Sequence, residues 1–520
     1  MRVEHRIGLA YLPGALPCFE GFGELPTDVV GGDGKVNGKP ASDVLDMIIV
    51  PGGSLVESQS TLDGILDEIS KMAENGKFVL GVCAGFQLLA KETDIGRLSA
   101  VPIIRKGLGL LDAKFRPLIC TDRVKATVAG KSFLTEGVEG DLAGFHCHTY
   151  GRVELGEGAK RLLVSHVNRV NYRKDPQDII SGATNEAGNV AGVLVHGLLD
   201  QNPCVVKSIA NSLGISDDEL QGIRMENREL TRRMRSEIGI STNIHAPENA
   251  QTQPRRAMVL LVTAIASGSG KTVVVTGLAG ALRRMGFRVG VMKIGGDIRD
   301  AVPALYLIKE PVREYTSLRI GESGWSPLIP AMREAEKAYD FLIVEGAMSV
   351  LTGVFNKAAQ RPSSTAEVAA ALGAPTILVV GCDKEGIEGA LLNTLTYARV
   401  LKAAGVRAEG AILNKVSPSF MGGAIREVVE RSLNDAGVRL LGMVPRADLE
   451  GRGAIPEIEI RYEEFCAKSL EIVERSIDLR SVIGLAAPFE ERAVDFTAFS
   501  DKMRALITEP DMISRGAEAC

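Results

Sequence analysis

The sequence predicts an α/β protein made of two doubly wound domains, each with a mostly parallel sheet between layers of helices. Short apolar runs of strand type alternate with helix-compatible segments through both halves of the chain. Several of these runs end in glycine or polar residues, as parallel strands do where their carboxyl ends carry ligand-binding loops. A polar, proline-bearing stretch, 240–256, separates the two halves and has the composition of a linker.

Composition limits the kind of protein that this chain can be. It has 520 residues, 45% of them hydrophobic, and a formal net charge of −5. This charge leaves no excess of basic residues of the kind that binds nucleic acid. No run approaches the roughly 20 apolar residues of a membrane span. Eight scattered cysteines without a C-x-x-C pair are typical of a reducing compartment. We therefore expect a cytoplasmic protein with no nucleic-acid partner and no membrane association.

The first half begins with the strand-type run IGLAYLP and continues with a second run, Asp46–Val50, that leads into Pro-Gly-Gly. A helix over 62–75 follows, and then a strand over 77–82. We place the first domain at residues 1–215. The charged, helix-compatible stretch after it and the linker occupy 216–256.

The first candidate catalytic motif is Gly-Val-Cys-Ala-Gly-Phe-Gln, which begins at Gly81. A cysteine between two glycines at a strand end predicts a nucleophile elbow, and the following helix N-terminus favours the thiolate of Cys83. The N–H of Ala84 points the same way. Gly53, in the glycine-rich turn of the neighbouring strand, is placed to complete an oxyanion hole. The alternative is that Cys83 is a buried structural cysteine.

A thiolate nucleophile needs a base, and the chain has six histidines. His196 follows the apolar run Val193–Val195 and precedes a glycine, so a base there can reach a cysteine on an adjacent strand. We therefore choose His196. The alternatives are two histidines in the terminus and the linker, one in a strand, and two in Gly-Phe-His-Cys-His, whose spacing does not suit zinc: His5, His245, His166, His146 and His148.

The second half is organised around Met258–Thr272, MVLLVTAIASGSGKT. A strand, a small-residue loop and a helix from about Thr272 to Arg284 predict a phosphate-binding loop for ATP. Lys271 would contact the β- and γ-phosphates, and Thr272 would hold Mg²⁺. The loop residues whose backbone would surround the phosphates are Ser267, Gly268, Ser269 and Gly270. The loop is one residue longer than the strict pattern, and the alternative is a Gly/Ser-rich loop without a phosphate.

Further strand ends of the second half carry polar residues. Asp297 follows the strand over 287–293, and Glu345 follows the strand over 339–344. A carboxylate at a strand end beside a phosphate-binding loop is well placed to organise Mg²⁺, although solvent-facing acidic residues are common. Three more strand-type runs follow, at 375–380, 408–413 and 440–444. We place the ATP-binding domain at 257–488 and a helix-compatible tail at 489–520.

Five motifs of the first half, in order, resemble those of class I glutamine amidotransferase domains. They are PGG, GVCAGFQLL, GLGLLDAKF, GFHCH and VLVHGLLDQN, and the match is to the subclass joined to cobyric and cobyrinic acid amide synthases. The resemblance spans about 6–213. It implies that Cys83 attacks the amide of glutamine to form a thioester and release ammonia, with His196 as the base and with Gly53 and Ala84 as oxyanion donors.

The first half also departs from the pattern of ordinary amidotransferases. They carry a Glu two residues after the histidine, where this chain has Leu198. The corrinoid branch of the family also lacks that Glu. The third member of the triad therefore stays unassigned, with Asp200 as a candidate. His146 stands where the relatives usually carry Glu.

The second half resembles the dethiobiotin synthetase-like domain of cobyrinic acid a,c-diamide synthases. The matching stretches are VMKIGGD, FLIVEGAMSVLTG, STAEVAAALGAPTILVVG, GAILNKV and LLGMVPR. The resemblance implies that Asn414 reads the adenine, that Lys271 and Lys293 hold phosphates, and that Mg²⁺ is held by Thr272, Asp297 and Glu345. The usual domain order is reversed here, and Gly451–Ile460 replaces an Arg-His-Leu-Gly-Leu stretch that helps to hold the corrinoid.

Together, the two resemblances imply an ATP- and Mg²⁺-dependent, glutamine-hydrolysing amide synthase. Such an enzyme phosphorylates a small-molecule carboxylate acceptor, here a corrinoid or related tetrapyrrole, and ammonia then displaces the phosphate. One alternative is a regulatory P-loop ATPase with an amidotransferase-like sensor domain. Another is a ligase that activates a non-tetrapyrrole acid. A homodimer stays open as the assembly.

Overall fold

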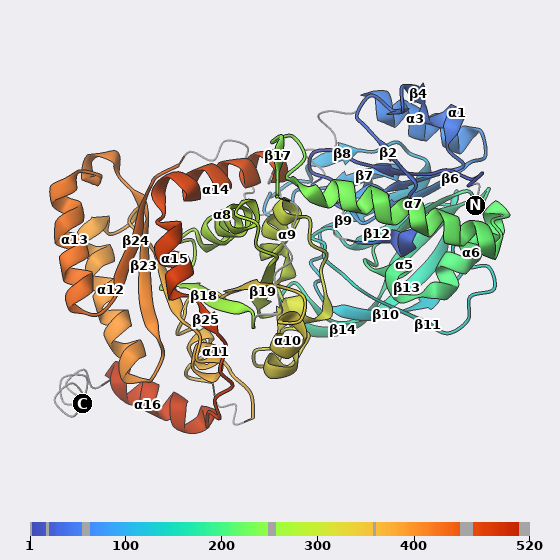
Figure 1. Cartoon of the computed structure of the whole chain (residues 1–520). Helices are drawn as coiled ribbons and strands as arrows, with labels where there is room; N and C mark the ends of the chain where they lie inside the picture. The colour runs from blue at the N-terminus through green and yellow to red at the C-terminus, as the bar shows by residue number, and fades with distance from the viewer. Residues whose placement is uncertain are drawn as a thin grey trace. The chain divides into compact units, whose positions relative to one another are not determined.

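A computed structural model of the chain describes residues 3–16, 20–54, 63–247, 256–356, 360–447 and 461–508. The replaced stretch Gly451–Ile460 and the end of the C-terminal tail lie outside these residues. The chain divides into two compact units, the first mainly up to Asn243 and the second mainly from Ile244 on. Each unit has its own sheet and its own helices (Figure 1).

The first unit is built on a nine-stranded sheet in the order β11-β10-β13-β14-β15-β6-β5-β1-β2. Five of these strands run parallel to their neighbours: β15 Val190–Val193, β6 Phe78–Val82, β5 Met47–Val50, β1 Ile7–Ala10 and β2 Asp28–Val30. The other four pair antiparallel at one edge: β11 Asp141–Phe145, β10 Arg123–Val128, β13 Ala159–Val170 and β14 Arg173–Asn185.

Apart from Asp28 in β2, the parallel strands consist of apolar residues and glycine, because both faces of the sheet are covered. In β5, Met47 and Ile49 join one buried cluster while Ile48 and Val50 join the other, as the period of two along a strand requires. The first cluster includes residues of α6 Pro203–Leu213 and α7 Asp217–Ser236. The second includes residues of α3 Asp63–Glu74 and α4 Ala84–Leu89 (Figure 1).

A second, four-stranded sheet packs into this unit in the order β12-β9-β7-β8. Its strands are β7 Ala90–Asp94, β8 Ile104–Lys106, β9 Leu111–Arg116 and β12 Arg152–Leu155. The remaining short elements of the unit are the hairpin β3 Lys35–Val36 and β4 Lys39–Pro40, β16 Glu237–Ile238, α1 Ala41–Val44, α5 Leu198–Gln201 and the 3₁₀ turn η1 Phe22–Glu24. The helix expected in the stretch 216–256 is α7, and it packs within the first unit.

The second unit holds a sheet of seven parallel strands in the order β20-β19-β21-β18-β22-β23-β24. The strands are β18 Met258–Ala264, β19 Val289–Ile294, β20 Ser317–Leu318, β21 Phe341–Glu345, β22 Thr376–Gly381, β23 Ala408–Val416 and β24 Arg439–Pro445. An eighth, short strand, β25 Ala487–Pro488, pairs antiparallel with the first residues of β18.

Helices cover both faces of this second sheet (Figure 1). One face packs against α10 Leu328–Ala335, α11 Thr365–Leu372, α12 Gly386–Ala403, α13 Gly423–Asp435 and α16 Phe496–Thr508. On the other side, α8 Lys271–Arg284 lies against α9 Val302–Ile308 and α14 Tyr462–Ser476. The helices are so close at Gly277 and Gly280 of α8 that an added Cβ would meet residues of α9 and α14. The unit also contains β17 Ile244–His245, α15 Leu479–Leu485 and the 3₁₀ turns η2 Ile298–Asp300, η3 Glu314–Thr316 and η4 Pro418–Phe420.

The predicted α/β class is confirmed, and the second unit has the expected parallel sheet. The sheet of the first unit is mixed, because the long hairpin β13–β14 and two further strands extend it antiparallel. Asn171 and Tyr172 connect the hairpin with φ of 49° and 66°, as a type I′ turn requires. The dipeptide lacks the glycine that is typical of such a turn, so sequence patterns do not predict this hairpin.

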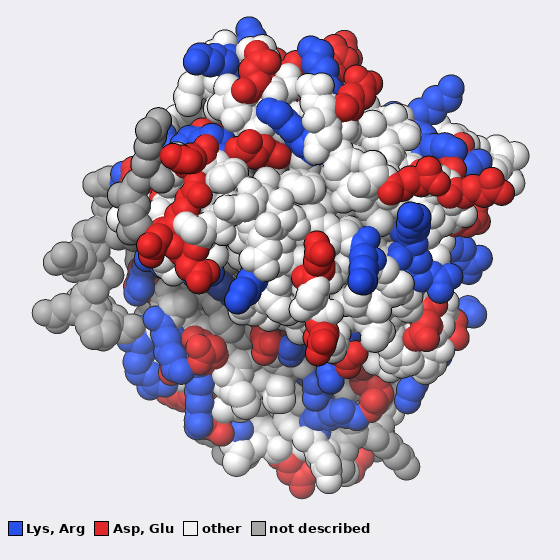
Figure 2. Space-filling model, turned by 90° about the vertical axis from the view of Figure 1, so that its right-hand side faces the viewer, with Lys and Arg blue, Asp and Glu red and all other residues white. Residues whose placement is uncertain are grey.

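Charged side chains of both signs are interspersed on the face shown in Figure 2, in line with 60 basic and 65 acidic residues in the chain. Within the described ranges, none of the helices combines the length and the apolar character needed to cross a bilayer.

Candidate active sites

Cys83 stands between the end of β6 and the start of α4, with φ 50° and ψ −104°. These angles are strained for a residue with a Cβ, and such strain is held by close packing around it. A Cβ at Gly81 would lie 2.6 Å from the carbonyl carbon of Gly85, and one at Gly85 would lie 2.0 Å from the Val50 oxygen. The backbone therefore has the geometry of a nucleophile elbow, for which only glycine fits at either side of the cysteine.

His196 lies three residues after the end of β15, the strand that pairs with β6. Its backbone bridges to Phe145, and the two rings stack with centroids 5.3 Å apart. Gly52 lies against the side chains of His196 and Cys83, because a Cβ there would be 2.8 Å from His196 Cε1 and 3.6 Å from Cys83 Cβ. The structure thus brings the two residues chosen from the sequence together, and it leaves room for them only because residue 52 has no side chain.

Glu20, which sequence reasoning missed, lies where a third member of a Cys83–His196 triad would be. Its Oε1 lies 2.5 Å from Nδ1 of His196, and its Oε2 accepts the N–H of Gly197 at 2.8 Å. The candidate Asp200 does not take this position. Its carboxylate accepts the N–H groups of Gly21 and Gly23, at 2.7 and 2.8 Å, and so holds the loop that carries Glu20.

The charges around His196 favour its protonated form. Burial is the largest influence and lowers the pKa of the imidazole, but the side chains of Cys83 and Glu20 raise it to about 10. The carboxylate on Nδ1 also leaves Nε2 to face the nucleophile. The site therefore holds a protonated imidazole next to the cysteine, an arrangement suited to a base that works with a cysteine nucleophile.

The two expected oxyanion donors are Ala84, which directly follows Cys83, and Gly53, which follows the glycine that lies against Cys83. Ala84 is the first residue of α4, where backbone N–H groups have no partner within the helix. Gly53 has φ 153° and forms an antiparallel bridge with Ala15; a Cβ there would lie 2.0 Å from the Gly14 oxygen. The chain next to these donors is therefore packed closely enough to fix their direction.

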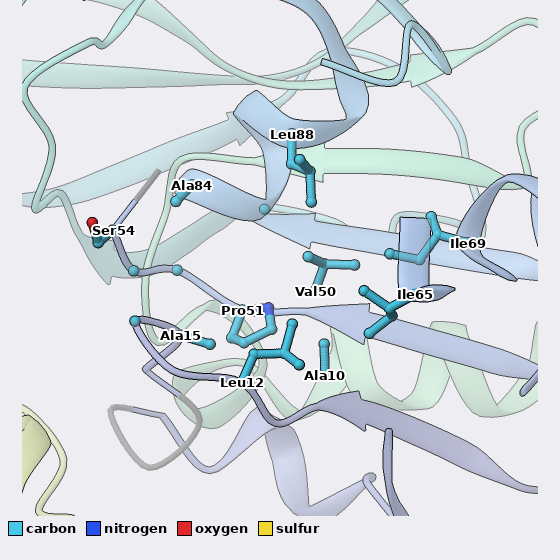
Figure 3. Close-up of a pocket in the computed structure, with 14 residues that line it drawn as sticks. Ala10, Leu12, Ala15, Val50, Pro51, Ser54, Ile65, Ile69, Ala84 and Leu88 are labelled. Carbon is cyan, nitrogen blue, oxygen red and sulfur yellow. The ribbon is translucent and has the colours of Figure 1, made fainter. Parts of the chain in front are cut away.

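A small cavity lies beside the Gly52–Gly53 turn (Figure 3). It offers about 20 Å³ to the centre of a water molecule, which is room for about one. Apart from Ser54, the side chains that line it are apolar: Ala10, Leu12, Ala15, Val50, Pro51, Ile65, Ile69, Ala84 and Leu88. No charged side chain therefore approaches the oxyanion donors from this side.

His146 and His148 lie close to the triad without forming a metal site. Nδ1 of His146 bonds to the Leu194 oxygen at 3.2 Å, and burial, followed by the nearby His196, lowers its pKa to about 3. His148 bonds to the Leu118 oxygen. Among the described residues, no group of three or more His, Cys, Asp or Glu side chains could hold a metal ion. Both histidines are buried, and His146 lies next to His196 in its neutral form.

In the second unit, β18, a loop and α8 form the strand, turn and helix expected for a phosphate-binding loop. Gly268 and Gly270 have φ of 77° and 88°, which favour glycine. Asn414 at the end of β23 braces the loop, since its Nδ2 donates to the Ser269 oxygen at 2.8 Å and would lie 2.1 Å from a Cβ at position 270. The amide of Asn414, expected to read adenine, is thus engaged with the loop itself.

The parallel register places the charged strand-end residues side by side. Glu345 of β21 pairs with Val262 of β18 on one side and with Lys293 of β19 on the other. The hydroxyl of Thr272, in the first turn of α8, donates to Glu345 Oε1 at 3.2 Å. Glu345 is fully buried, and its Oε2 has no partner among the described residues. A buried carboxylate oxygen with an open lone pair beside a hydroxyl fits Mg²⁺.

The other charged groups of this site are bonded within the protein. Lys271 donates to the Met348 oxygen at 2.8 Å, and Lys293 pairs with Asp300 at 2.7 Å and lies 3.6 Å from Glu345 Oε1. Asp297, a further expected Mg²⁺ ligand, is bonded through both oxygens to Arg299, at 2.8 and 2.7 Å. Bound ATP would have to replace some of these contacts.

These contacts set the charge states of the site. Burial is the largest influence on each group: it raises the pKa of Glu345 and lowers that of Lys271, which the neighbouring Lys293 lowers further. For Lys293, burial is outweighed by Glu345 and Asp300, and its pKa is raised. The site thus holds a buried cation next to Glu345, a setting suited to an anionic ligand.

Comparison with known proteins matches each half of the chain to a different family model. Residues 27–204 match the CobB/CobQ-like glutamine amidotransferase domain, and residues 260–452 match the CobQ/CobB/MinD/ParA nucleotide binding domain. The matched stretches contain Cys83 and His196 in one case and the phosphate-binding loop in the other. Both resemblances noted in the sequence are therefore confirmed.

Curated relatives match part of the chain. A hydrogenobyrinate a,c-diamide synthase of Mycobacterium tuberculosis is 34% identical over 242 residues, which are 44% of this chain and 50% of that protein. A cobyric acid synthase of Dehalococcoides mccartyi is 33% identical over 165 residues, 30% of this chain and 31% of that protein. The chain thus spans half or less of the length of these relatives. Among solved structures, PurLQS from Thermotoga maritima has a TM-score of 0.31 and 24% identity over 40% of this chain and 99% of that one.

Proposed function

Because this chain joins a CobB/CobQ-like glutamine amidotransferase domain to a CobQ/CobB/MinD/ParA nucleotide-binding domain, we propose that it is an ATP-dependent, glutamine-hydrolysing amide ligase. The observation that carries the proposal is a complete Cys83–His196–Glu20 triad in a chain that also holds a phosphate-binding loop. A sensor domain would need no aligned nucleophile, so the triad disfavours the regulatory alternative.

The glutaminase half follows from the triad. The Cys83 thiolate attacks the side-chain carbonyl of glutamine, and the oxyanion that forms accepts the N–H groups of Gly53 and Ala84. His196 gives its proton to the leaving nitrogen, and ammonia departs while a glutamyl thioester remains on Cys83. Neutral His196 then takes a proton from water, which hydrolyses the thioester to glutamate. Glu20 stabilises the imidazolium each time it forms.

The ATP half uses the groups around Glu345. The backbone of residues 267–270 and the ammonium groups of Lys271 and Lys293 would bind the phosphates. A carboxylate of the acceptor attacks the γ-phosphorus, ADP leaves, and an acyl phosphate forms. Ammonia then attacks the acyl carbon, phosphate leaves, and an amide remains. Asn414 would act on the nucleotide indirectly, because it supports the loop that would bind the phosphates.

Thr272 and Glu345 are the residues that fit Mg²⁺ best, and Asp297 would join them once Arg299 released it. The ion would neutralise charge that develops on the phosphate oxygens. Lys293, which lies beside Glu345, would offer a second cation to the same oxygens.

The acceptor that we propose is a corrinoid or related tetrapyrrole carboxylate. Support comes from the relatives, which are a hydrogenobyrinate a,c-diamide synthase and a cobyric acid synthase. A tetrapyrrole with several carboxylates would also account for a dedicated glutaminase domain, because each amidation consumes one molecule of ammonia. A cytoplasmic location suits an enzyme that needs ATP, glutamine and a free thiol.

The test is phosphate release from ATP by the purified protein with glutamine, with and without cobyrinic acid and hydrogenobyrinic acid, and with mass spectrometry of the acceptor. We expect acid-dependent ADP formation in step with replacement of carboxyl groups by carboxamides. Glutamine hydrolysis and ATP turnover that no tetrapyrrole stimulates would keep the ligase and reject the tetrapyrrole. Absence of glutamine hydrolysis altogether would reject the proposed function.

A further inference from the structure

The third member of the triad does not belong to the strand that carries His196. Glu20 lies 176 residues earlier, in the loop between β1 and β2, and it reaches His196 only because this loop is docked on the end of β15 and on α5. The triad is therefore complete only while the loop is in place. Phe22, Gly23 and Glu24 all have positive φ, a conformation that costs about 1 kcal/mol or more for each non-glycine residue, so contacts from outside the loop help to stabilise it.

Helix α7 supplies contacts that hold the loop. Nδ2 of Asn227, a side chain only 5% exposed, donates to the Pro26 oxygen at 2.8 Å. Arg228 bonds to Glu24 at 3.4 Å, and Arg224 lies 3.9 Å from the same carboxylate. One helix thus bonds to the loop at two points, four and six residues after Glu20.

Apolar packing joins the same two elements. Ile223 and Leu230 of α7 belong to the buried cluster that also contains Phe22 and Leu25 of the loop. These side chains are on the same helix face as Asn227, since the spacing of three and four residues brings them into one stripe. A shift of α7 would therefore move the loop with it, because a closely packed interface transmits displacement.

We propose that α7 is a positioning element of the glutaminase triad, because it holds the loop that carries Glu20 against His196. The inference rests on the proposed glutaminase function of the first domain. When α7 holds the loop, Glu20 stabilises the imidazolium of His196. When the contacts of α7 with the loop are lost, the carboxylate moves away from Nδ1 and ammonia production slows.

The first experiment measures glutaminase kcat/KM against pH for Asn227→Ala, Glu20→Gln and the double variant. Asn227 touches no reacting atom, so an effect through Glu20 must disappear when Glu20 is already replaced. We expect Asn227→Ala to lower kcat/KM about tenfold and to move the alkaline limb of the profile toward lower pH, as Glu20→Gln does. The double variant should match Glu20→Gln alone.

Two surface variants keep the test independent of folding. Glu24→Gln weakens the contacts to Arg224 and Arg228 without burying or exposing a core group, and we expect a two- to threefold loss in kcat/KM. Glu229→Gln is the matched control, because Glu229 pairs with Arg232 on the same helix at an exposed position and should leave the rate unchanged. Equal effects of these two variants, or additive effects of Asn227→Ala and Glu20→Gln, would overturn the positioning role.

The second experiment measures the glutaminase rate of the unaltered chain. A wild type that hydrolyses no glutamine at all would reject the proposed function. An active wild type whose rate and pH profile are unchanged by Asn227→Ala would overturn only the positioning role of α7.

Discussion

In the first domain the catalytic groups face one another, whereas in the second domain most of the groups expected to hold ATP are bonded to other parts of the protein. Glu20 and His196 meet at 2.5 Å beside Cys83, in a site that a glycine at residue 52 leaves open. Lys271 is bonded to the Met348 oxygen and Asp297 to Arg299. The first site is ordered for its reaction, and the second must exchange internal partners for its ligand.

The difference follows from what each site has to stabilise. A thiolate and an imidazolium neutralise each other, so the glutaminase triad can be arranged fully without substrate. A cluster of lysines built for a triphosphate has an excess of one charge sign, and it must use carboxylates and carbonyls until the nucleotide arrives. The variants below test whether the two sites are independent and whether each depends on the contacts described for it.

The largest effect is expected for Cys83→Ser. A serine hydroxyl beside His196 is a far weaker nucleophile than the thiolate, so glutaminase activity should fall by about ten thousandfold. ATP-dependent amidation with free ammonia should persist, since the second domain keeps all its residues. The two rates should be measured on one preparation; undiminished glutamine hydrolysis would remove Cys83 from the nucleophile position.

Lys271→Ala should give the converse result. Removing the ammonium from the phosphate site should lower ATP turnover with free ammonia by several hundredfold. Basal glutaminase activity, measured without nucleotide, should stay close to that of the wild type. If turnover persists, the lysine does not contact the transferred phosphate and the loop has been misinterpreted.

Glu20→Gln tests the residue that the structure added to the triad. The neutral amide removes one of the two groups that raise the pKa of His196 to about 10, so the pKa of the imidazole should fall. The imidazolium would then lose its proton at lower pH, and the alkaline limb of glutaminase kcat/KM should move toward neutrality. At neutral pH we expect a loss of about a hundredfold. An unchanged profile would show that Glu20 does not act on His196.

The sequence revealed the sites where chemistry is local in the chain. The phosphate-binding loop lies within fifteen consecutive residues, and the elbow around Cys83 within seven, so their spacing alone predicts a strand, a turn and a helix. His196 could be chosen because it ends an apolar run. The second domain's parallel sheet also follows from repeated strand-and-helix units, each of which carries its own signal.

Glu20 could not be found in this way, because 176 residues separate it from His196 and its loop has no periodic pattern. The resemblance directed attention to the position after the histidine, where Asp200 was the nearest acid. Asp200 does contribute, but through the backbone of Gly21 and Gly23. The signal that could have identified Glu20 is an acid in a mostly apolar loop, followed by Gly-Phe-Gly; the loop contains a second acid, Glu24. That signal becomes specific only when the fold places the loop beside His196.

Glu345→Gln sharpens the comparison in the second domain. The buried Oε2 without a partner is the best candidate for a bond to Mg²⁺, and an amide would replace a negative oxygen at this position. The Mg²⁺ concentration for half-maximal ATP turnover should rise about tenfold. Glutaminase activity without nucleotide is the internal control, because Glu345 has no part in it. An unchanged Mg²⁺ titration would exclude Glu345 from the metal site.

The smallest effect is expected for Asp200→Asn, which asks how firmly the Glu20 loop must be held. Asp200 accepts two N–H groups, and an asparagine can accept only one of them well, because its NH₂ group would face the other donor. The net loss of one charge-assisted hydrogen bond should lower glutaminase kcat/KM about threefold.

The shape of the pH profile separates the two roles that Asp200 could have. If it acts by holding Glu20, the variant should shift the alkaline limb in the same direction as Glu20→Gln but by less, and combining the two changes should add nothing. If Asp200 touched the reaction directly, its loss would add to that of Glu20. Such additivity would indicate that Asp200 acts directly in the reaction as a second acid, and that the position of the loop does not depend on its contacts with α5. The contacts on Gly21 and Gly23 favour the first outcome, since both carboxylate oxygens of Asp200 are already engaged there.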